Sequence, residues 1–304
     1  MRSALTPQVK AGLLEIDFYH WRLRQNRFPG VAVLAYHGVR SDAAAPGQQP
    51  FEGLHVTEKE LDSHCRLLKD TCRPISLAEW RSTRNRKAGL PARPVLITFD
   101  DGYRSIWKYA LPILRKYGIP AVMFICSGPV EQRRLFWFDA VARARGEAEV
   151  EDMKRLPFED WRLLCSQPSQ FREDDPAAPL SIEEVIKLSR EPGLEIGSHT
   201  ASHAILARAS KAIQFREIVE DKARLEAWIN KPVTSFAYPN GQPHQDYTQE
   251  TVNLVKEADF EMAFTTQAGF ANRDQTPLEH SRFLMLSDVS EAELAHRLCF
   301  SWRR

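Results

Sequence analysis

Short apolar runs rich in β-branched residues alternate with longer segments of helical periodicity, and this alternation constrains the fold more than any other feature. Turn or polar residues follow each run, which is typical of buried strands. The runs span residues 31–36, 95–99, 121–126, 194–196, 234–238 and 262–265. Regular alternation of strand and helix predicts a parallel α/β sheet or barrel.

The intervening segments carry helix signals. Residues 57–69 open with a capping-box arrangement of Thr57 and Glu60. We also expect helices at residues 105–117, 181–190, 213–229, 249–258 and 291–300. Residues 127–180 break the alternation and are interpreted as an insertion with some helix, and residues 1–30 as a helical extension, all within one domain that spans residues 1–304.

Composition excludes some classes of function. Lysine plus arginine (41) nearly balances aspartate plus glutamate (40), so no global field favours a nucleic-acid partner. The first residues lack the apolar core of a signal peptide, and no apolar run approaches the roughly 20 residues of a transmembrane segment. The five cysteines form no CxxC pair. We therefore expect a reduced, cytoplasmic protein.

Two adjacent carboxylates, Asp100 and Asp101, directly follow the apolar run 95–99. Binding and catalytic sites of α/β folds are built at such strand ends. The structural alternative is that these aspartates cap the helix that begins near Ser105. A second feature has to decide between the two interpretations.

That feature is His199 and His203, which follow the run 194–196. Two histidines four residues apart share a face if the backbone is helical, so both imidazoles can reach one ion. Such a pair alone is as often a surface or core feature. Combined with Asp101 it offers two nitrogens and one oxygen, a ligand set that suits zinc and that cobalt, nickel or iron would also accept.

These segments resemble the polysaccharide deacetylase family, which shares the NodB homology domain (carbohydrate esterase family four). The resemblance rests on five stretches: Thr98-Phe-Asp-Asp-Gly102, His199-Thr-Ala-Ser-His203, Tyr36-His-Gly-Val39, Phe236-Ala-Tyr-Pro-Asn-Gly241 and Phe136-Trp-Phe-Asp139. It covers roughly residues 31–286 and implies a distorted (β/α) barrel of about seven strands.

The resemblance also implies roles for individual residues. Asp101, His199 and His203 match the family's metal ligands. Asp100 matches the base that takes a proton from the attacking water. The backbone N–H of Asn240 matches the oxyanion donor, and Tyr238 or Pro239 would form the wall of the pocket.

This sequence departs from the family pattern in two places. The third motif lacks the arginine that orients the base, and Arg282 is our candidate substitute, with a surface ion pair as the alternative. We expect the contact of Arg282 with Asp100 to be partial or shared with solvent. For the leaving-group acid, His280 is the better candidate and His296 the worse, because His296 falls within the expected terminal helix.

Two further residues are candidates for substrate binding. His37 follows the first strand and either lines the pocket or closes the barrel as a structural residue. Trp137 and Phe138 either stack on a sugar ring or form a small core within the insertion.

The function expected from these residues is metal-dependent hydrolysis of an N-acyl group, most simply N-acetyl, from an amino sugar or glycan precursor. Because we expect a cytoplasmic protein, a nucleotide-linked or lipid-linked substrate fits better than a secreted polymer. Two alternatives stay open: a cyclic-amide hydrolase of the same fold, and a carbohydrate-binding protein with weak catalysis.

Overall fold

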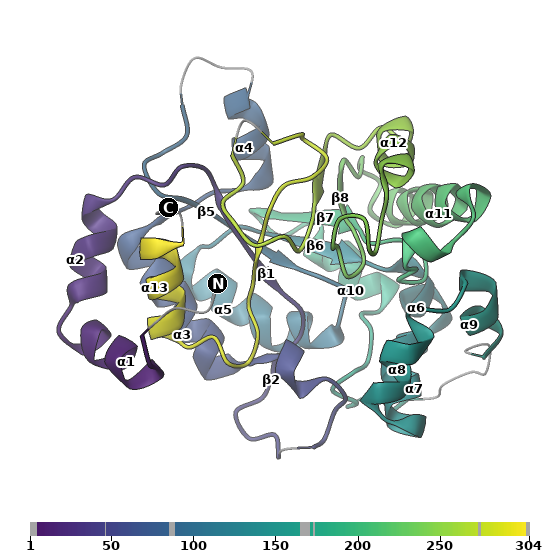
Figure 1. The fold of residues 1–304 in the computed structure, drawn as a ribbon, viewed down its shortest axis with the longest axis horizontal. Coiled ribbons are helices and arrows are strands. Elements are labelled where there is room, and N and C mark those ends of the chain that lie inside the picture. The colour runs from purple at the N-terminus through teal and green to yellow at the C-terminus, as the bar shows by residue number, and fades with distance from the viewer. Residues whose placement is uncertain are drawn as a thin grey trace.

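A curled parallel sheet occupies the centre of the molecule (Figure 1). The computed structural model describes residues 5–45, 47–84, 89–164, 171–172, 174–272 and 275–301. Within these residues, seven parallel strands follow the order β10-β1-β5-β6-β7-β8-β9, and β4 pairs with the start of β5. The predicted seven-strand distorted barrel is therefore confirmed, as a curled half-barrel.

Six strands, β1 and β5 to β9, coincide with the apolar runs of the sequence, whereas β2, β3, β4 and β10 fall outside those runs. The strands of the main sheet are β1 (Ala32–Tyr36), β4 (Arg73–Pro74), β5 (Pro94–Phe99), β6 (Ala121–Ile125), β7 (Leu194–Ser198), β8 (Ser235–Ala237), β9 (Met262–Phe264) and β10 (Phe283–Leu284). A separate parallel pair is formed by β2 (Val39–Arg40) and β3 (Val56–Thr57). Nearly every residue of β1, β5 and β6 is buried, as expected for parallel strands covered on both faces.

Alternate strand residues pack into two different cores because successive side chains point to opposite faces of a sheet. On β1, Val33 belongs to the core inside the curl, whereas Leu34 belongs to the larger core under the outer helices. Leu96 and Val122 join Val33 inside the curl, and Trp80 closes that core. The inside of the barrel is therefore filled with side chains, and a ligand site has to lie at one of its ends.

The helices pack outside the sheet (Figure 1). They are α1 (Pro7–Glu15), α2 (Phe18–Gln25), α3 (Glu58–Thr71), α4 (Leu77–Arg84), α5 (Leu111–Tyr117), α6 (Ser127–Gln132), α7 (Trp137–Arg145), α8 (Glu147–Met153), α9 (Phe158–Leu164), α10 (Ile182–Leu188), α11 (Lys211–Ile229), α12 (Gln249–Glu257) and α13 (Glu291–Phe300). Shorter helical turns are η1 (Glu52–Leu54), η2 (Ile106–Ala110, a π-helical turn before α5) and η3 (Leu206–Arg208). The capping box of Thr57 and Glu60 is present at the start of α3.

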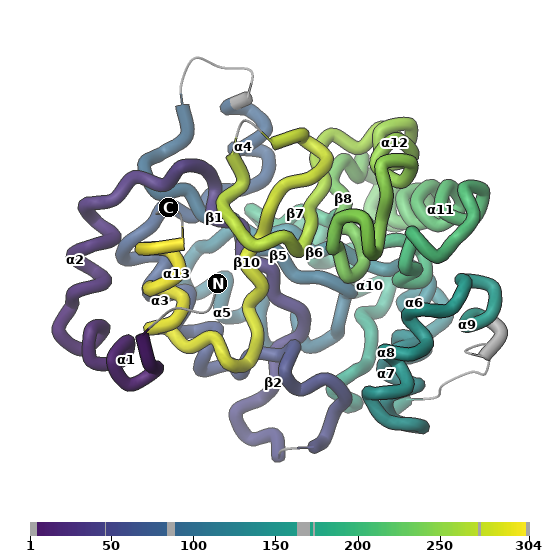
Figure 2. The backbone as a smooth tube through the Cα atoms, viewed as in Figure 1, coloured from purple at the N-terminus to yellow at the C-terminus, as the bar shows by residue number. Residues whose placement is uncertain are grey.

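The two segments that interrupt the alternation are both helical. Helices α6 to α9 follow β6 and precede β7 along the chain, and they pack on the side of the molecule where α11 lies (Figure 1). At the other side of the molecule, α1 and α2 pack against α13, so the first and last helices of the chain lie side by side (Figures 1 and 2). No helix in the described part of the chain is long and apolar enough to cross a membrane.

Candidate metal centre

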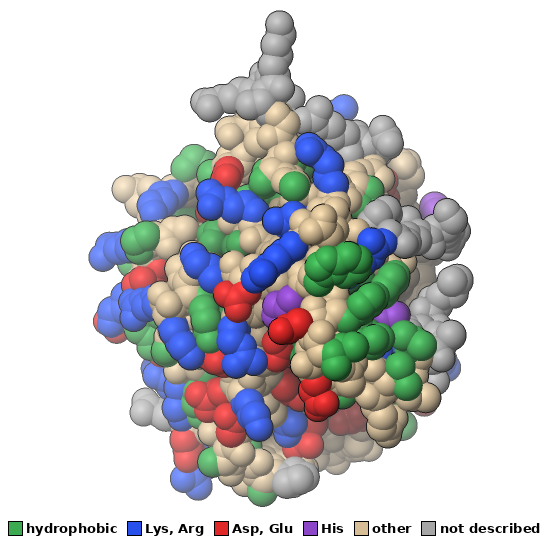
Figure 3. Space-filling view, turned by 90° about the vertical axis from the view of Figure 1, so that its left-hand side faces the viewer, with side chains coloured by type: hydrophobic (Ala, Val, Ile, Leu, Met, Phe, Trp, Pro, Cys, Tyr) green, Lys and Arg blue, Asp and Glu red, His purple; other side chains and the backbone are tan. Residues whose placement is uncertain are grey.

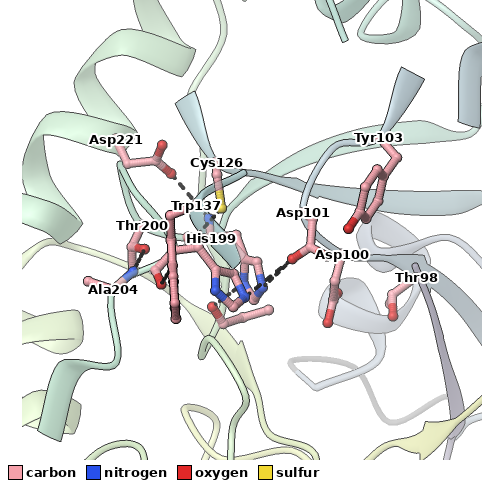
Figure 4. A network of polar contacts seen from close by, with 12 residues as sticks. Thr98, Asp100, Asp101, Tyr103, Cys126, Trp137, His199, Thr200, Ala204 and Asp221 are labelled. Atoms are coloured by element: carbon pink, nitrogen blue, oxygen red, sulfur yellow. Dashed lines mark hydrogen bonds and ion pairs between the residues drawn. The ribbon is translucent and has the colours of Figure 1, made fainter. Parts of the chain in front are cut away.

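Asp101, His199 and His203 converge at the carboxyl ends of β5 and β7, which both pair with β6. His199 Nε2 lies 3.4 Å and His203 Nε2 3.3 Å from Asp101 Oδ1. Figure 4 shows Asp101 and His199 pointing toward one another across the end of the sheet. All three side chains are buried, and their ligand atoms lie within 4.8 Å of one another.

The geometry suits a divalent ion. In a tetrahedral site with bonds of about 2.0–2.2 Å, neighbouring ligand atoms lie about 3.3–3.6 Å apart, which matches the observed spacing. Asp101 Oδ1 is buried, yet it accepts no hydrogen bond within the described residues. Burial lowers the pKa of His203 to about 3, so its imidazole is neutral and has a lone pair for an ion.

Asp101 and His199 shift each other's pKa values in opposite directions. Burial raises the pKa of Asp101, but its close contacts with the His199 and His203 imidazoles outweigh burial and lower this pKa well below its usual value. Burial lowers the pKa of His199, but the negative charges of Asp101 and Asp100 outweigh burial and raise this pKa. A bound cation would take the place of the proton that these carboxylates attract.

The backbone around the ligands is irregular. Asp101, Thr200 and His203 adopt positive φ angles of 71°, 66° and 57°. Residues 199–205 form a bend rather than a helix, so the expectation that helical spacing brings the two imidazoles together is wrong. Residues in the left-handed region persist only where their surroundings hold them, and they cluster at functional sites.

Several contacts fix the orientation of His199. Its Nδ1 donates a hydrogen bond to the Ala237 carbonyl at 2.7 Å, which leaves Nε2 free to face an ion. The backbone N–H of His199 donates to Asp221 Oδ2 at 3.1 Å, and the N–H of Ser127 donates to Asp221 Oδ1 at 2.7 Å. Burial raises the pKa of Asp221 despite these donors. Asp221 therefore ties α11 and α6 to the loop that carries the metal ligands.

Asp100 is paired with Arg282, as the sequence predicts. The guanidinium donates two hydrogen bonds of 2.7 Å, one to each oxygen of the Asp100 carboxylate, and a third of 3.2 Å to Thr98 Oγ1. Burial raises the pKa of Asp100, but the positive charge of Arg282 outweighs burial and lowers this pKa. Arg282 is 0% and Asp100 2% exposed, so both the expected sharing with solvent and the surface-pair alternative are wrong.

Asn240 lies in a tight turn after β8. It has a φ of 55°, and its backbone N–H donates no hydrogen bond within the described residues. The turn is held by Thr266, whose hydroxyl donates to the Asn240 carbonyl and whose N–H donates to the Gly241 carbonyl. The Gln242 N–H donates to Asp246 at 2.8 Å. A rigid turn therefore leaves one N–H available to a bound oxygen.

These groups border one cavity of about 430 Å³. It is lined by His37, Phe51, Leu54, Asp100, Asp101, Phe138, Val150, Glu151, Lys154, Arg155, His199, His203, Ile205, Arg208, Asn240, Gln242, Gln245, Asp246, Thr266 and Leu284. His37 thus lines the pocket, which is one of the two alternatives that the sequence left open for this residue. Its Nδ1 is buried and has no hydrogen-bond partner within the described residues.

Three expected substrate contacts lie elsewhere. Tyr238 and Pro239 are buried outside this cavity, and Tyr238 stacks on Tyr247 with ring centroids 4.0 Å apart. Trp137 stacks on Trp161 at 4.7 Å, which favours the small-core interpretation. Its indole N–H donates to the His203 carbonyl at 3.2 Å, so Trp137 supports a ligand without facing the pocket.

His280 also lies away from the metal ligands. It borders a different cavity, together with residues before β1 and at the start of β5, at the amino ends of the strands. The centroid of its ring lies 4.7 Å from that of Trp80, which is part of the core inside the curl. A proton donor there does not reach the cavity that contains Asp101, so the expectation that His280 is the acid does not fit this structure.

Sequence reasoning missed two kinds of residue at the site, the basic residues that border the cavity and the buried carboxylate of Asp221. Lys154 and Arg208 bring cations to the cavity, but their position depends on the folding of the insertion and of the loop after His203, for which the sequence has no local signal. Asp221 did leave a signal. It falls between Ile218 and Leu225 on the buried face of α11, where helical spacing calls for an apolar residue.

A buried cluster of two histidines and a carboxylate beside a second carboxylate, at the carboxyl end of a curled parallel sheet, defines a candidate metal-dependent hydrolase. The polysaccharide deacetylase family model matches residues 87–263, and the chain belongs to this family.

Individual relatives agree with this assignment. The poly-β-1,6-N-acetyl-D-glucosamine N-deacetylase of Staphylococcus aureus is 33% identical over 242 residues, which cover 79% of this chain and 71% of the relative. The protein of that name from Escherichia coli K12 is 24% identical over 292 residues, and the match spans 88% of this chain but 38% of that longer protein. The solved structure of the Streptococcus pyogenes deacetylase PplD in complex with acetate covers 89% of this chain and 99% of its own, with a TM-score of 0.66 at 21% identity, which shows a shared fold.

Proposed function

We propose that this protein hydrolyses N-acetyl groups of an amino-sugar glycan with the help of a divalent ion. The observation that carries the proposal is that Asp101, His199 and His203 share one cavity with Asp100, whose carboxylate forms a buried ion pair with Arg282. The names of the Staphylococcus aureus and Escherichia coli relatives support an N-acetylglucosamine polymer as the first substrate to test. Zinc is the ion that we propose first.

The residues of the cavity divide the reaction among them. A divalent ion, when bound, lowers the pKa of a water molecule and polarises the amide carbonyl. Asp100 takes the proton from the attacking water, because a carboxylate offers about four lone-pair positions and Arg282 occupies two of them. The Asn240 N–H donates to the carbonyl oxygen of the substrate while that oxygen gains negative charge. This hydrogen bond lowers the activation barrier by about 3 kcal/mol.

His37 is our candidate for the acid that protonates the leaving amine. It borders the cavity next to Asp100, and its buried Nδ1 has no hydrogen-bond partner within the described residues. The nitrogen of an amide is a poor leaving group until it gains a proton, so a donor within the cavity is required. His37 fits this requirement, whereas His280 borders another cavity.

The activity test uses N-acetylglucosamine oligomers and measures free amine and acetate. We expect turnover by the metal-loaded protein, none after chelation, and recovery when zinc is added back. Asp100→Asn is the control for contaminating activity, because it should retain the ion and lose turnover. Absence of turnover on every acetamido sugar, with the ion bound, would contradict the proposed reaction.

The acid role of His37 is tested with two leaving groups. His37→Gln should lower kcat/KM for the oligomers by about 10²-fold or more. The same variant should leave hydrolysis of an aryl acetate ester nearly unchanged, because that leaving group departs without a proton. His280→Gln is the matched control, and a larger loss in this control than in His37→Gln would overturn the assignment.

A phosphate-bearing precursor is our second substrate class. Lys154 and Arg208 border the cavity and supply cations that suit a nucleotide-linked or lipid-linked sugar. Comparing kcat/KM for a nucleotide-linked acetamido sugar with that for a neutral oligomer decides between the classes. A cytoplasmic site of action remains part of this proposal and is tested by cell fractionation.

A further inference from the structure

Exposed apolar side chains concentrate on the first two helices. Among the described residues, five large hydrophobic residues are exposed by more than a third: Leu5 37%, Val9 47%, Ile16 72%, Trp21 57% and Phe215 43%. The first four fall within 17 consecutive positions (5–21) of the chain. We call these four residues the α1–α2 patch.

The patch follows the outer side of α1 and continues onto α2. Val9 lies within α1, Leu5 lies just before its N-cap Thr6, and Ile16 is its C-cap, and all three side chains are exposed. Lys10 points elsewhere, because it is buried and ion-paired with Glu293 of α13. Trp21 continues the patch on α2, with its ring 6.2 Å from that of Phe18. The patch therefore faces outward from a pair of helices that α13 anchors.

Basic side chains adjoin the patch. Figure 3 shows a cluster of apolar side chains on this face of the molecule, beside many lysine and arginine side chains that are interspersed with acidic ones. Arg22 and Arg24 occupy the last turn of α2, which has no acidic residue in its first turn, and Arg27 follows shortly after. The acidic Asp17 at the helix junction lies 3.4 Å from His20 Nδ1.

The size and chemistry of the patch favour a lipid surface over a second protein chain. From the exposed fractions, the four side chains present roughly 400 Å² of apolar surface, about half of the 800 Å² that each partner of a stable dimer buries. An exposed isoleucine and an exposed tryptophan close to arginines suit the interface of an anionic bilayer, where the aromatic ring lies at headgroup level and the arginines meet lipid phosphates.

We propose that the α1–α2 patch docks this protein on the surface of an anionic phospholipid membrane. The apolar side chains enter the headgroup region, and Arg22, Arg24 and Arg27 contact lipid phosphates. None of the patch residues lines the cavity of the metal ligands. The docking is therefore independent of the deacetylase proposal, and changes in the patch leave hydrolysis of a soluble substrate unaltered.

The test is co-sedimentation of the full chain with phosphatidylcholine vesicles that contain or lack phosphatidylglycerol. The wild type should bind the anionic vesicles, and Ile16→Ser with Trp21→Ser should lower the partition coefficient at least about tenfold. Phe215→Ser, on α11, is the matched control and should bind as the wild type does. Arg22→Gln with Arg24→Gln should lower binding by about fivefold per arginine, and high salt should remove this difference.

Three outcomes would overturn the proposal. One is that the wild type does not bind anionic vesicles, and another is that the Ile16 and Trp21 variant binds as well as the Phe215 variant. The third is a wild-type dimer in light scattering that Ile16→Ser dissociates, which would make the patch a contact between copies of the chain. Circular dichroism and hydrolysis of a soluble substrate show whether the variants are folded.

Discussion

Replacing Arg282 with methionine should both destabilise the protein and slow turnover, because one buried side chain serves both purposes. The guanidinium is 0% exposed and donates to both oxygens of Asp100. It also donates to the Thr265 carbonyl at 2.8 Å and to Thr98 Oγ1 at 3.2 Å. Methionine fills much of the same space but satisfies none of these acceptors.

The size of the effect follows from burial. Removing one partner of a buried ion pair leaves the other charge without compensation and costs about 3–5 kcal/mol of unfolding free energy. We therefore expect Arg282→Met to lose about this much, measured by urea unfolding of metal-depleted protein so that ion binding does not mask the change. With the carboxylate free to turn toward the ion, kcat/KM should fall at least about tenfold.

A double-mutant cycle isolates the cause. Asp100→Asn combined with Arg282→Met should be less destabilised than Arg282→Met alone, because no buried charge is left over. Arg282→Lys should be intermediate, since lysine keeps the charge but cannot donate to both oxygens in the same geometry. A loss below about 1 kcal/mol in Arg282→Met, together with kcat/KM within about twofold of wild type, would refute the reasoning.

Further predictions concern the ligands and the loops that hold them. His199→Ala should lose both the bound ion and activity, whereas Asp100→Asn keeps the ion and loses turnover; elemental analysis beside kcat decides, and near wild-type kcat in Asp100→Asn disproves its role as the base. Asp221→Asn should weaken metal affinity about 10–100-fold, and an unchanged competition titration with a chelator would show that Asp221 does not position His199. Gly241→Ala should lower both thermal stability, by about 1–3 kcal/mol, and kcat, because its φ is 73° and a Cβ would lie 2.8 Å from Thr266 N; a variant with wild-type melting temperature and kcat would contradict the rigid-turn argument.

The sheet could be predicted because its signal is local. The predicted strands, β1 and β5 to β9, are runs of mostly buried apolar residues, and the end of each run marks an edge at which polar side chains gather. Asp101 after β5 and His199 after β7 therefore had to lie near one another, since β6 pairs with both strands. The strand-end argument required no knowledge of the loops themselves.

The path of those loops could not be predicted. His203 reaches the ion site through left-handed residues in a bend, and nothing in the local pattern distinguishes that bend from the helical turn that the spacing suggests. The packing of the insertion could not be predicted either. Its aromatic run was recognisable, but the stacking of Trp137 on Trp161 depends on how α7 and α9 pack, which local periodicity does not encode.

A comparison of His280, the acid candidate from the sequence, with His37, the candidate from the cavity, shows where sequence reasoning needs geometry. His37 follows β1 directly, so strand polarity alone places it at the carboxyl end of the sheet, where Asp100 also lies. His280 precedes β10 and forms a bridge with Phe264 on β9, and a residue that precedes a parallel strand lies toward the amino end. Strand polarity, applied to both histidines, therefore favours His37 over His280 as the candidate acid.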